Sequence, residues 1–436
     1  MIRRIELAVV AAILLLAAFS TGVSYLFFLV YVGLLVVGGA YLISRFGLSD
    51  LEAGFALDRV QATVGETLRA TYTLRNTSRL PKLWLETFNG STLPVPLPGR
   101  ALALGPRGER SWAARVPLVR RGHFRIDPLT VRTGDPLGLF EASATVGTAA
   151  AVTVYPRVEP LPGWRLPATS LEGNRASRDR TLQTTPLVTS IRPYLPGDAF
   201  NRIHWPTTAR QGELQVKEFD LEQTADLWIF LDLDRSMHVG HGDESTLEAG
   251  VRVAAALAGH ALLDNRAVGL TASGRHSAVL PADRGGRQHH KIMRLLAAVE
   301  ADGQTPLVEV LLQGLVRLRR GMTAAVITSS LDRDWVLPLS TLRVRGVATV
   351  VCRLDAAAYA EHAVAQGHGP GAMGQEAAQI AQTRARADRA MRHALAEYDL
   401  RAYEIVPGHP LGELLSGAGP RAAAAGSGGA AAWARQ

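Results

Sequence analysis

The chain has 436 residues, of which 47% are hydrophobic, and its formal net charge is +8. Its single cysteine, Cys352, excludes a disulfide framework within the chain and a metal cluster held by several thiolates. The basic residues are almost all Arg and are scattered, with no run longer than a pair such as Arg319–Arg320, whereas nucleic-acid binders collect them on one face. We therefore expect no nucleic-acid partner, although a partner with an acidic surface stays open. The length predicts two or three domains.

Two apolar runs, Leu7–Phe19 and Tyr25–Ile43, stand near the N-terminus. A membrane-spanning helix needs roughly 20 predominantly apolar residues, and the second run meets this requirement. The first run meets it only if it includes Ile5 and the weakly polar stretch Ser20–Ser24 that separates the runs. The two runs predict a transmembrane hairpin over residues 1–48.

The charges that flank these runs predict the orientation. Arg3 and Arg4 precede the first run, Arg45 follows the second, and the connection carries no charge. Because positive residues stay on the cytoplasmic side, both ends of the hairpin and everything after Arg45 should face the cytoplasm. We expect a multi-pass protein of a bacterial inner membrane. The alternative is a cleaved signal peptide that comprises the first run, with Arg3 and Arg4 as its charged start.

Residues 49–160 have the pattern of short strands. Thr67–Leu74 largely alternates polar and apolar residues, as a half-buried strand does. Several further strands between turn signals, with no helical period, predict a small β-sandwich that acts as a spacer or docking surface. These strands are Leu83–Phe88, Ser111–Val116, His123–Ile126 and Ala151–Tyr155.

From about Ala225 the pattern changes to strands that alternate with helices. This alternation predicts a doubly wound α/β domain over residues 226–415, with a parallel sheet covered on both faces. A family-specific segment over 161–225 precedes it, and an Ala/Gly-rich tail over 416–436 should be disordered. The expected strands are Leu227–Leu231, Ala267–Thr271, His276–Leu280, Ala324–Thr328, Val347–Cys352 and Ala402–Val406. The expected helices are Thr246–Leu263, Arg287–Val299, Pro306–Leu318 and Gln375–Glu397.

Carboxylates and hydroxyls follow several of the predicted strands, where such sheets bind their ligands. Asp232, Asp234 and Ser236 alternate after the first strand, so one loop can turn all three to the same side. Thr305 and Ser329 lie in later loops. These oxygen ligands suit a hard cation such as Mg²⁺, with Mn²⁺ as the other candidate. The same residue types also form turns and helix caps, so a structural role stays open.

The segment before this domain contains the stretch R-x-Y-x-P-G-D, followed by R-x-I-x-W and A-R. Its Pro-Gly pair favours a tight turn, and the Asp could accept backbone N–H groups or pair with the following Arg. The Trp is a large apolar anchor. The segment is either a clamp that packs against the sheet or a partner-binding surface. The residues concerned are Arg192, Tyr194, Pro196, Gly197, Asp198, Arg202, Trp205 and Arg210.

These motifs resemble the family catalogued as domain of unknown function 58, whose hallmark is this stretch followed by a strand that ends in D-x-S-x-S-M. Upstream, Arg121–Phe124, Asp135–Phe140 and Val154–Pro156 agree with the same family. The resemblance implies a C-terminal domain similar to von Willebrand factor A (vWA) domains. It also implies a partnership with an AAA+ ATPase of the MoxR type, in assembly or envelope maintenance.

The vWA resemblance also implies a metal-ion-dependent adhesion site of the form D-x-S-x-S, completed by a Thr and an Asp on later loops. Asp232 and Ser236 match this pattern, and Thr305 matches the Thr. Asp234 stands where Ser is usual, and Ser329 stands near the position of the later Asp. The resemblance therefore implies a metal site whose two carboxylates lie in one loop, with weakened adhesion.

Two enzymatic alternatives use the same loop. A phosphatase of the haloacid-dehalogenase type would take Asp232 as nucleophile and Asp234 as acid/base, with Ala325–Ser329 as its second motif. Such enzymes need a downstream Lys, and none follows Lys291. A membrane glycosyltransferase would use Asp232–Leu233–Asp234 as a D-x-D site. We expect an interaction protein rather than an enzyme.

Overall fold

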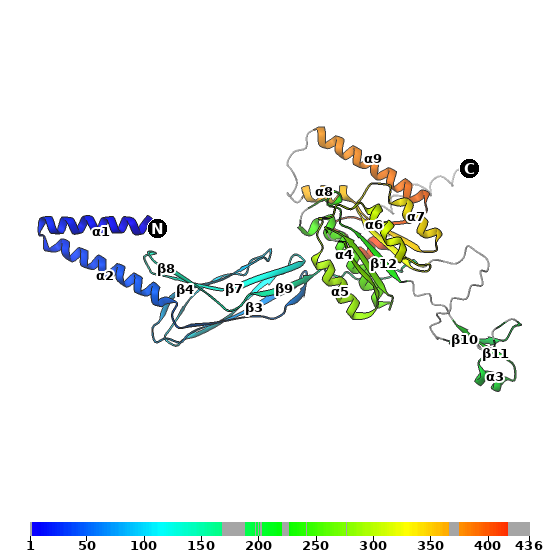
Figure 1. Cartoon of the computed structure of the whole chain (residues 1–436), viewed down its shortest axis with the longest axis horizontal. Helices are drawn as coiled ribbons and strands as arrows, with labels where there is room; N and C mark the ends of the chain where they lie inside the picture. The colour runs from blue at the N-terminus through cyan, green and yellow to red at the C-terminus, as the bar shows by residue number, and fades with distance from the viewer. Residues whose placement is uncertain are drawn as a thin grey trace, which may run out of the picture. The chain divides into compact units, whose positions relative to one another are not determined.

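The computed structural model divides the chain into two units (Figure 1), each described by itself below. Unit 1 comprises Met1–Glu159, His241–Ala255 and His290–Glu300, and unit 2 comprises Pro160–Gly240, Ala256–His289 and Ala301–Gln436. The structure describes residues 2–167, 188–196, 198, 200, 203–219, 226–240, 242–275, 277–365 and 375–416. Gly197, Arg202 and the predicted tail from Gly417 lie outside the described residues.

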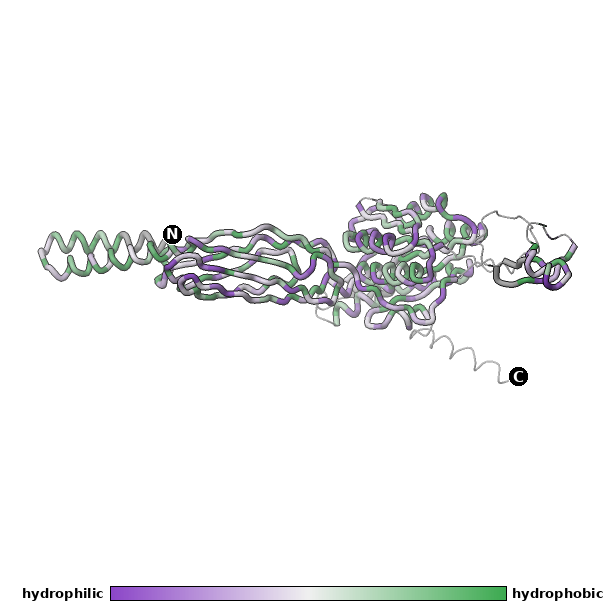
Figure 2. Tube along the Cα trace, turned by 90° about the horizontal axis from the view of Figure 1, so that it is seen from below, coloured by the Kyte–Doolittle hydropathy of each residue, from purple (hydrophilic) through white to green (hydrophobic). Residues whose placement is uncertain are grey.

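Unit 1 begins with two helices, α1 (Ile2–Thr21) and α2 (Ser24–Gly47), which lie side by side (Figures 1 and 2). The rings of Phe19 and Phe27 meet edge to face at 5.2 Å between centroids. Helix α2 is long and apolar enough to cross a membrane, and only 6% of its most apolar window is buried. Helix α4 (Thr246–Leu263) passes the same test but is 72% buried, which marks it as a core helix. The exposed apolar N-terminus indicates membrane association.

The strands of unit 1 form two sheets around one hydrophobic core. Strand β3 (Thr67–Asn76) alternates buried and exposed residues along nearly its whole length, as its sequence predicts. The core joins Leu68 and Leu74 of β3 to Leu85 and Ile126 of the other sheet. The smaller sheet has the order β1 (Leu51–Leu57), β3, β6 (Glu109–Pro117). The larger has the order β2 (Gln61–Thr63), β9 (Ala150–Tyr155), β7 (Gly122–Gly134), β4 (Lys82–Ser91), β5 (Arg100–Leu104), and β8 (Glu141–Val146) pairs with β7.

Two of the upstream motifs have structural roles in unit 1. Arg121 is buried and donates to the carbonyl oxygens of Leu296 (2.8 Å) and Val299 (2.6 Å) at the C-terminal end of α5 (Gly285–Ala298). A cation there complements the partial negative charge of the helix end. Burial would raise the pKa of Asp135, but hydrogen bonds from the N–H groups of three residues lower it overall. These residues are Phe140, Leu137 and Leu139.

Unit 2 contains a six-stranded sheet in the order β14-β13-β12-β15-β16-β17. Numbered along the chain, this is the order 3-2-1-4-5-6 of doubly wound sheets, and it reverses between β12 and β15. All neighbouring strands are parallel except the edge pair β13 and β14. The strands are β12 (Leu227–Asp232), β13 (Val268–Ser273), β14 (Ser277–Asp283), β15 (Thr323–Thr328), β16 (Ala348–Leu354) and β17 (Arg401–Ile405).

Helices pack on this sheet and bury its central strands (Figure 1). One core cluster joins Phe230 and Val326 of the sheet to Leu311, Leu339 and Met391 on three helices. Those helices are α6 (Leu307–Gly314), α7 (Val336–Val344) and α9 (Gln375–Glu397). Two shorter helices follow strands of the sheet along the chain: α8 (Ala356–Ala365) comes after β16, and α10 (Leu411–Leu415) comes after β17. Cys352 is a buried free thiol in β16, as predicted.

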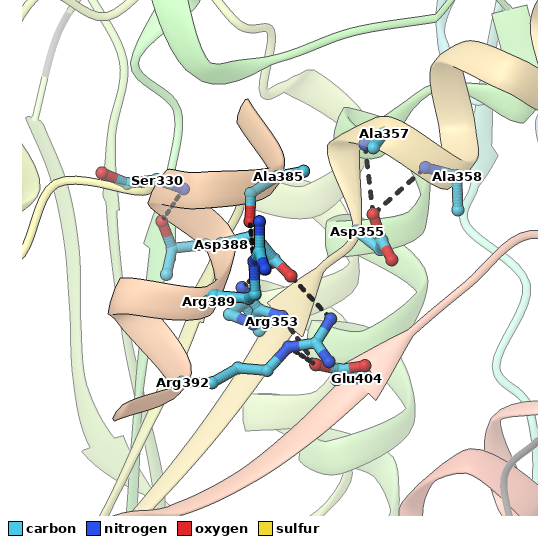
Figure 3. Close-up of polar contacts among 11 residues, drawn as sticks. Ser330, Arg353, Asp355, Ala357, Ala358, Ala385, Asp388, Arg389, Arg392 and Glu404 are labelled. Carbon is cyan, nitrogen blue, oxygen red and sulfur yellow. Dashed lines mark hydrogen bonds and ion pairs between the residues drawn. The ribbon is translucent and has the colours of Figure 1, made fainter. Parts of the chain in front are cut away.

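A charged cluster ties α9 to the neighbouring strands (Figure 3). Arg353 of β16 is 2% exposed and pairs with Asp388 of α9 and, at 2.6 Å, with Glu404 of β17. Arg392 of α9 pairs with the same two carboxylates, at 2.6 and 3.0 Å. Two positive and two negative groups are thereby neutralised within the unit.

Residues 188–219 form a small element of unit 2. Strand β10 (Val188–Pro193) pairs antiparallel with β11 (Gln215–Phe219). The short helix α3 (Trp205–Gln211) lies between them and is capped at its start by His204, whose side chain accepts the N–H of Thr207. We call this element the 188–219 hairpin.

Candidate functional site

The predicted metal residues gather around the point where the strand order of the six-stranded sheet reverses. Asp232 is the last residue of β12, and Thr328 is the last residue of β15. The Thr328 hydroxyl donates to Asp232 Oδ2 at 2.6 Å, and the Asp234 N–H donates to Asp232 Oδ1 at 3.1 Å. Asp232 is only 4% exposed. Both of its carboxylate oxygens are thus held by neighbours of the same sheet edge.

Burial raises the pKa of Asp232 above its usual value. The hydrogen bonds from Thr328 and from the Asp234 N–H oppose this shift, and so does the positive charge of His238 when it is protonated. Burial is the larger effect, so the folded protein favours the protonated form of this carboxyl more than the unfolded chain does.

Asp234 and Ser236 are engaged with each other. Asp234 Oδ1 accepts the Ser236 N–H at 2.9 Å and the Ser236 hydroxyl at 2.8 Å. This geometry caps the short 3₁₀ helix at Arg235–Met237. Asp234 therefore takes the role of a helix cap, the structural alternative that the sequence left open, and Ser236 donates to it.

Further contacts close the loops around this edge. The Ser329 hydroxyl donates to the Met237 carbonyl at 2.6 Å. Gly303 exchanges backbone hydrogen bonds of 3.0 Å with Leu233 and Arg235 on either side of Asp234. A Cβ on Gly303 would lie 2.5 Å from the Ser273 carbonyl oxygen, so the approach requires glycine. We call Asp232, Asp234, Ser236, Thr328 and Ser329 the Asp232 cluster.

Most of the oxygens of the Asp232 cluster already take part in hydrogen bonds within the protein. Hydroxyl and backbone N–H donors occupy both oxygens of Asp232 and one of Asp234, and Ser329 points its proton at a carbonyl. No hydrogen bond joins Thr305 to the cluster among the residues that the structure describes. The same part of the chain contains no group of three or more His, Cys, Asp or Glu placed to hold a metal.

The R-x-Y-x-P-G-D stretch forms the turn after β10. The Arg192 guanidinium binds both carboxylate oxygens of Asp198, at 2.8 and 2.9 Å, and Asp198 also accepts the Leu195 N–H at 2.9 Å. The predicted backbone acceptor role of Asp198 is confirmed. Arg192 and Asp198 lie on either side of the same turn and form an ion pair. The expected pairing of Asp198 with Arg202 is not tested, because Arg202 lies outside the described residues. The bidentate pair fixes the turn from both sides.

The hairpin presents large apolar side chains to solvent. Phe200 is 70% exposed, Trp205 63% and Leu195 59%, and the rings of Tyr194 and Phe200 lie 6.0 Å apart. Trp205, the large apolar residue of this segment, begins α3 and lies on an exposed face. Pro196 and Arg210 are exposed as well. We call Leu195, Phe200 and Trp205 the hairpin surface.

Both regions lie in the part of the chain that matches a known family. Residues 190–364 match the model described as "Protein of unknown function DUF58". The resemblance to the DUF58 family that the motifs indicate is therefore confirmed over these residues. It is also 26% identical over 308 residues to a Bacillus subtilis (strain 168) protein with the printed name "Uncharacterized protein YeaD", covering 68% of this chain and 74% of that one. The DUF58 match begins in the hairpin and ends in α8.

Solved structures give likenesses over about a quarter of the chain. The CARDB domain of the PF1109 protein from Pyrococcus furiosus matches at 14% identity and a TM-score of 0.19, covering 24% of this chain and 92% of that one. A PapD-like domain of human CEP192 matches at 10% identity and a TM-score of 0.18, covering 26% and 89%. Scores this low carry no argument about the fold.

Proposed function

We propose that this chain is a membrane-anchored interaction protein that binds a partner protein through the hairpin surface. The observation that carries the proposal is the exposure of Leu195, Phe200 and Trp205 on one small element. Exposed apolar groups of this kind mark binding surfaces, and aromatic residues are the usual anchors of protein interfaces. The Arg192–Asp198 pair supports the surface by fixing the turn beneath it.

The finer proposal is that the partner is an AAA+ ATPase of the MoxR type, in assembly or envelope maintenance, and that the sheet of unit 2 is a vWA-like domain. The strand order 3-2-1-4-5-6 and the acidic loop after β12 support a vWA-like domain. The partner's identity rests on the family resemblance, which is an argument by analogy.

A pull-down from detergent-solubilised native membranes tests this proposal. Wild type is compared with Phe200→Ala/Trp205→Ala, and with Leu263→Ala as a control, because Leu263 is 87% exposed on α4. We expect an ATPase that wild type and the control retain and that the hairpin variant loses. Equal retention by all three proteins would move the partner surface elsewhere.

We also propose that α1 and α2 form a transmembrane hairpin with the rest of the chain in the cytoplasm. Cys352 cannot report this topology, because it is buried and its pKa is raised to about 12 by burial. Cysteines introduced singly at Val23, between the helices, and at Val60, after them, can; their exposures are 48% and 61%. A membrane-impermeant thiol reagent should label Val23→Cys but not Val60→Cys in intact cells. Labelling of Val60→Cys would reverse the orientation.

The phosphatase of the haloacid-dehalogenase type remains the alternative. It would need an Asp232 carboxylate that is ionised and open to substrate. Asp232 is instead nearly buried, its pKa is raised by burial, and it accepts a hydrogen bond from Thr328. These properties favour the interaction protein over the phosphatase.

A further inference from the structure

A pocket of about 430 Å³ lies in unit 1, where the C-terminal end of α2 meets β4 and β7. Its apolar walls come from Leu42, Ile43 and Phe46 of α2 and from Leu83 and Trp84 of β4. Neither the Asp232 cluster nor the hairpin surface takes part in it. A mostly apolar pocket with few polar groups is typical of sites for small ligands.

Close packing holds the walls of this pocket in place. A Cβ on Gly47 would lie 2.7 Å from Thr133 Cγ2, and a Cβ on Gly134 would lie 3.0 Å from the Trp84 ring, so both contacts depend on glycine. Lys82 Nζ donates to the Phe46 carbonyl at 2.6 Å, and the same oxygen also accepts the Ser49 hydroxyl at 2.9 Å in the last turn of α2. The end of α2 is thereby fixed to the two strands.

The rim of the pocket is apolar and exposed. Leu80 and Leu83 are 57% and 64% exposed, and Trp84 is 41% exposed. The rim continues the apolar surface of α2, where the Tyr41 ring meets the Phe140 ring at 5.6 Å. Trp and Tyr are enriched where a protein crosses the boundary between lipid and water. A membrane surface explains why these side chains are not covered by protein.

The polar groups of the pocket suit a ligand with one charged end. Lys82 is buried, and burial lowers the pKa of its ammonium because the charged form loses solvation, while the Asp50 carboxylate acts in the opposite direction. A further anionic group beside Lys82 would offset more of this lost solvation. The two hydrogen-bond acceptors of Lys82 are a carbonyl and the Ser49 hydroxyl (3.4 Å). Asp135, which also lines the pocket, is already occupied by three backbone N–H groups.

We propose that this pocket holds one glycerophospholipid of the surrounding bilayer, with an acyl chain against Leu42, Phe46 and Trp84 and the head-group phosphate near Lys82. The inference rests on the proposed membrane anchoring through α1 and α2. It adds a specific lipid site at the point where α2 enters the β-domain. The bound lipid would help to hold β4 and β7 against the C-terminal end of α2.

Photo-crosslinking of the full chain in lipid vesicles tests this inference. The vesicles contain phosphatidylethanolamine, phosphatidylglycerol and a trace of phosphatidylglycerol with a diazirine in its acyl chain. Adducts are mapped by mass spectrometry of peptides. We compare wild type, Leu80→Ser/Leu83→Ser at the rim, and Val60→Ser/Val119→Ser, whose residues are 61% and 39% exposed and do not line the pocket.

We expect adducts at residues 133–137 of wild type and of the control, normalised to adducts on α1 and α2. In the rim variant, the adduct yield at residues 133–137 should fall about threefold. The two introduced hydroxyl groups make the entrance less favourable for an acyl chain. Equal adducts in all three proteins, or cross-links to a second protein chain there, would overturn the lipid site. Vesicle flotation separates the two proposals. A chain that floats without pocket adducts overturns only the lipid site, and one that does not float overturns the anchoring as well.

Discussion

The Asp232 cluster and the hairpin surface are both parts of the DUF58 match, and they use polar residues in opposite ways. In the cluster, carboxylates and hydroxyls bind each other and the backbone, and Asp232 is 4% exposed. In the hairpin, the Arg192–Asp198 pair fixes a turn that exposes Phe200 and Trp205. The motifs of one region can thus serve the fold in one place and expose apolar side chains in another. Changes in the cluster should alter stability, and changes in the hairpin should alter binding.

The buried charges of unit 2 should show the largest stability effect. Replacing Arg353 by Leu leaves the partly buried Asp388 and Glu404 with Arg392 alone, and we expect a loss of about 3 kcal/mol in unfolding free energy. The measurement is the urea dependence of Cys352 labelling in the full chain in detergent, since the thiol reacts only when β16 opens. Arg284→Leu is the control, because its pair with Asp226 at 3.4 Å is half exposed. An equal loss in both variants would contradict this account.

Truncation of the cluster should come next. Asp232→Ala leaves the buried Thr328 hydroxyl and the Asp234 N–H without their acceptor, which costs about 2 kcal/mol. Asp232→Asn retains an acceptor and should cost less. Both losses are read from the same Cys352 labelling midpoints. An Asp232→Ala protein as stable as wild type would show that the cluster does not support the sheet.

The pH dependence of Asp232 gives a smaller effect of defined sign. Because burial raises the pKa of folded Asp232 above its usual value, the native state binds more protons than the unfolded state between these two pKa values. Wild type should therefore lose stability relative to Asp232→Asn as pH rises through this window, by at most about 1.4 kcal/mol per pH unit. Urea midpoints read from tryptophan fluorescence, collected from pH 4 upward, test this, because thiol labelling is too slow at acidic pH. A difference that grows in favour of wild type with rising pH would show that the pKa is lowered instead.

Divalent cations should have the smallest effect. If the cluster is satisfied by its own hydrogen bonds, millimolar Mg²⁺ or Mn²⁺ should change the unfolding free energy by less than about 0.5 kcal/mol. A larger increase that disappears in Asp232→Ala would mean that the cluster rearranges around a bound ion. That result would restore the metal site predicted from the vWA resemblance.

Local patterns in the sequence were sufficient to predict the main strands. Continuous apolar runs predict β12, β15 and β16, because both faces of these strands are buried. Alternation of polar and apolar residues predicts β3, because only one of its faces is buried. Helices α7 and α8 were missed. The first carries Pro338 near its start, and the second is largely Ala, so neither has a clear apolar period.

The contacts that define the sites depend on distant residues. The hydrogen bond from Thr328 to Asp232 joins positions 96 residues apart, so no local pattern indicates it, whereas the vWA resemblance points to the neighbouring Ser329. The close approach of Gly303 to the Leu233 and Ser273 carbonyls also depends on the fold, and the sequence marks it only by a glycine two residues before Thr305. The size of Trp205 is compatible with both a packing clamp and a partner-binding surface, and its exposure follows from tertiary context alone.

The most direct test compares the two regions in one binding experiment. Wild type, Phe200→Ala/Trp205→Ala and Asp232→Asn, each checked for folding by Cys352 protection, are titrated with the partner captured by wild type. We predict that the hairpin variant binds at least about tenfold more weakly, as loss of two aromatic anchors implies, while Asp232→Asn binds like wild type. Weaker binding by Asp232→Asn, with the hairpin variant unchanged, would contradict the account and place the partner site at the sheet edge.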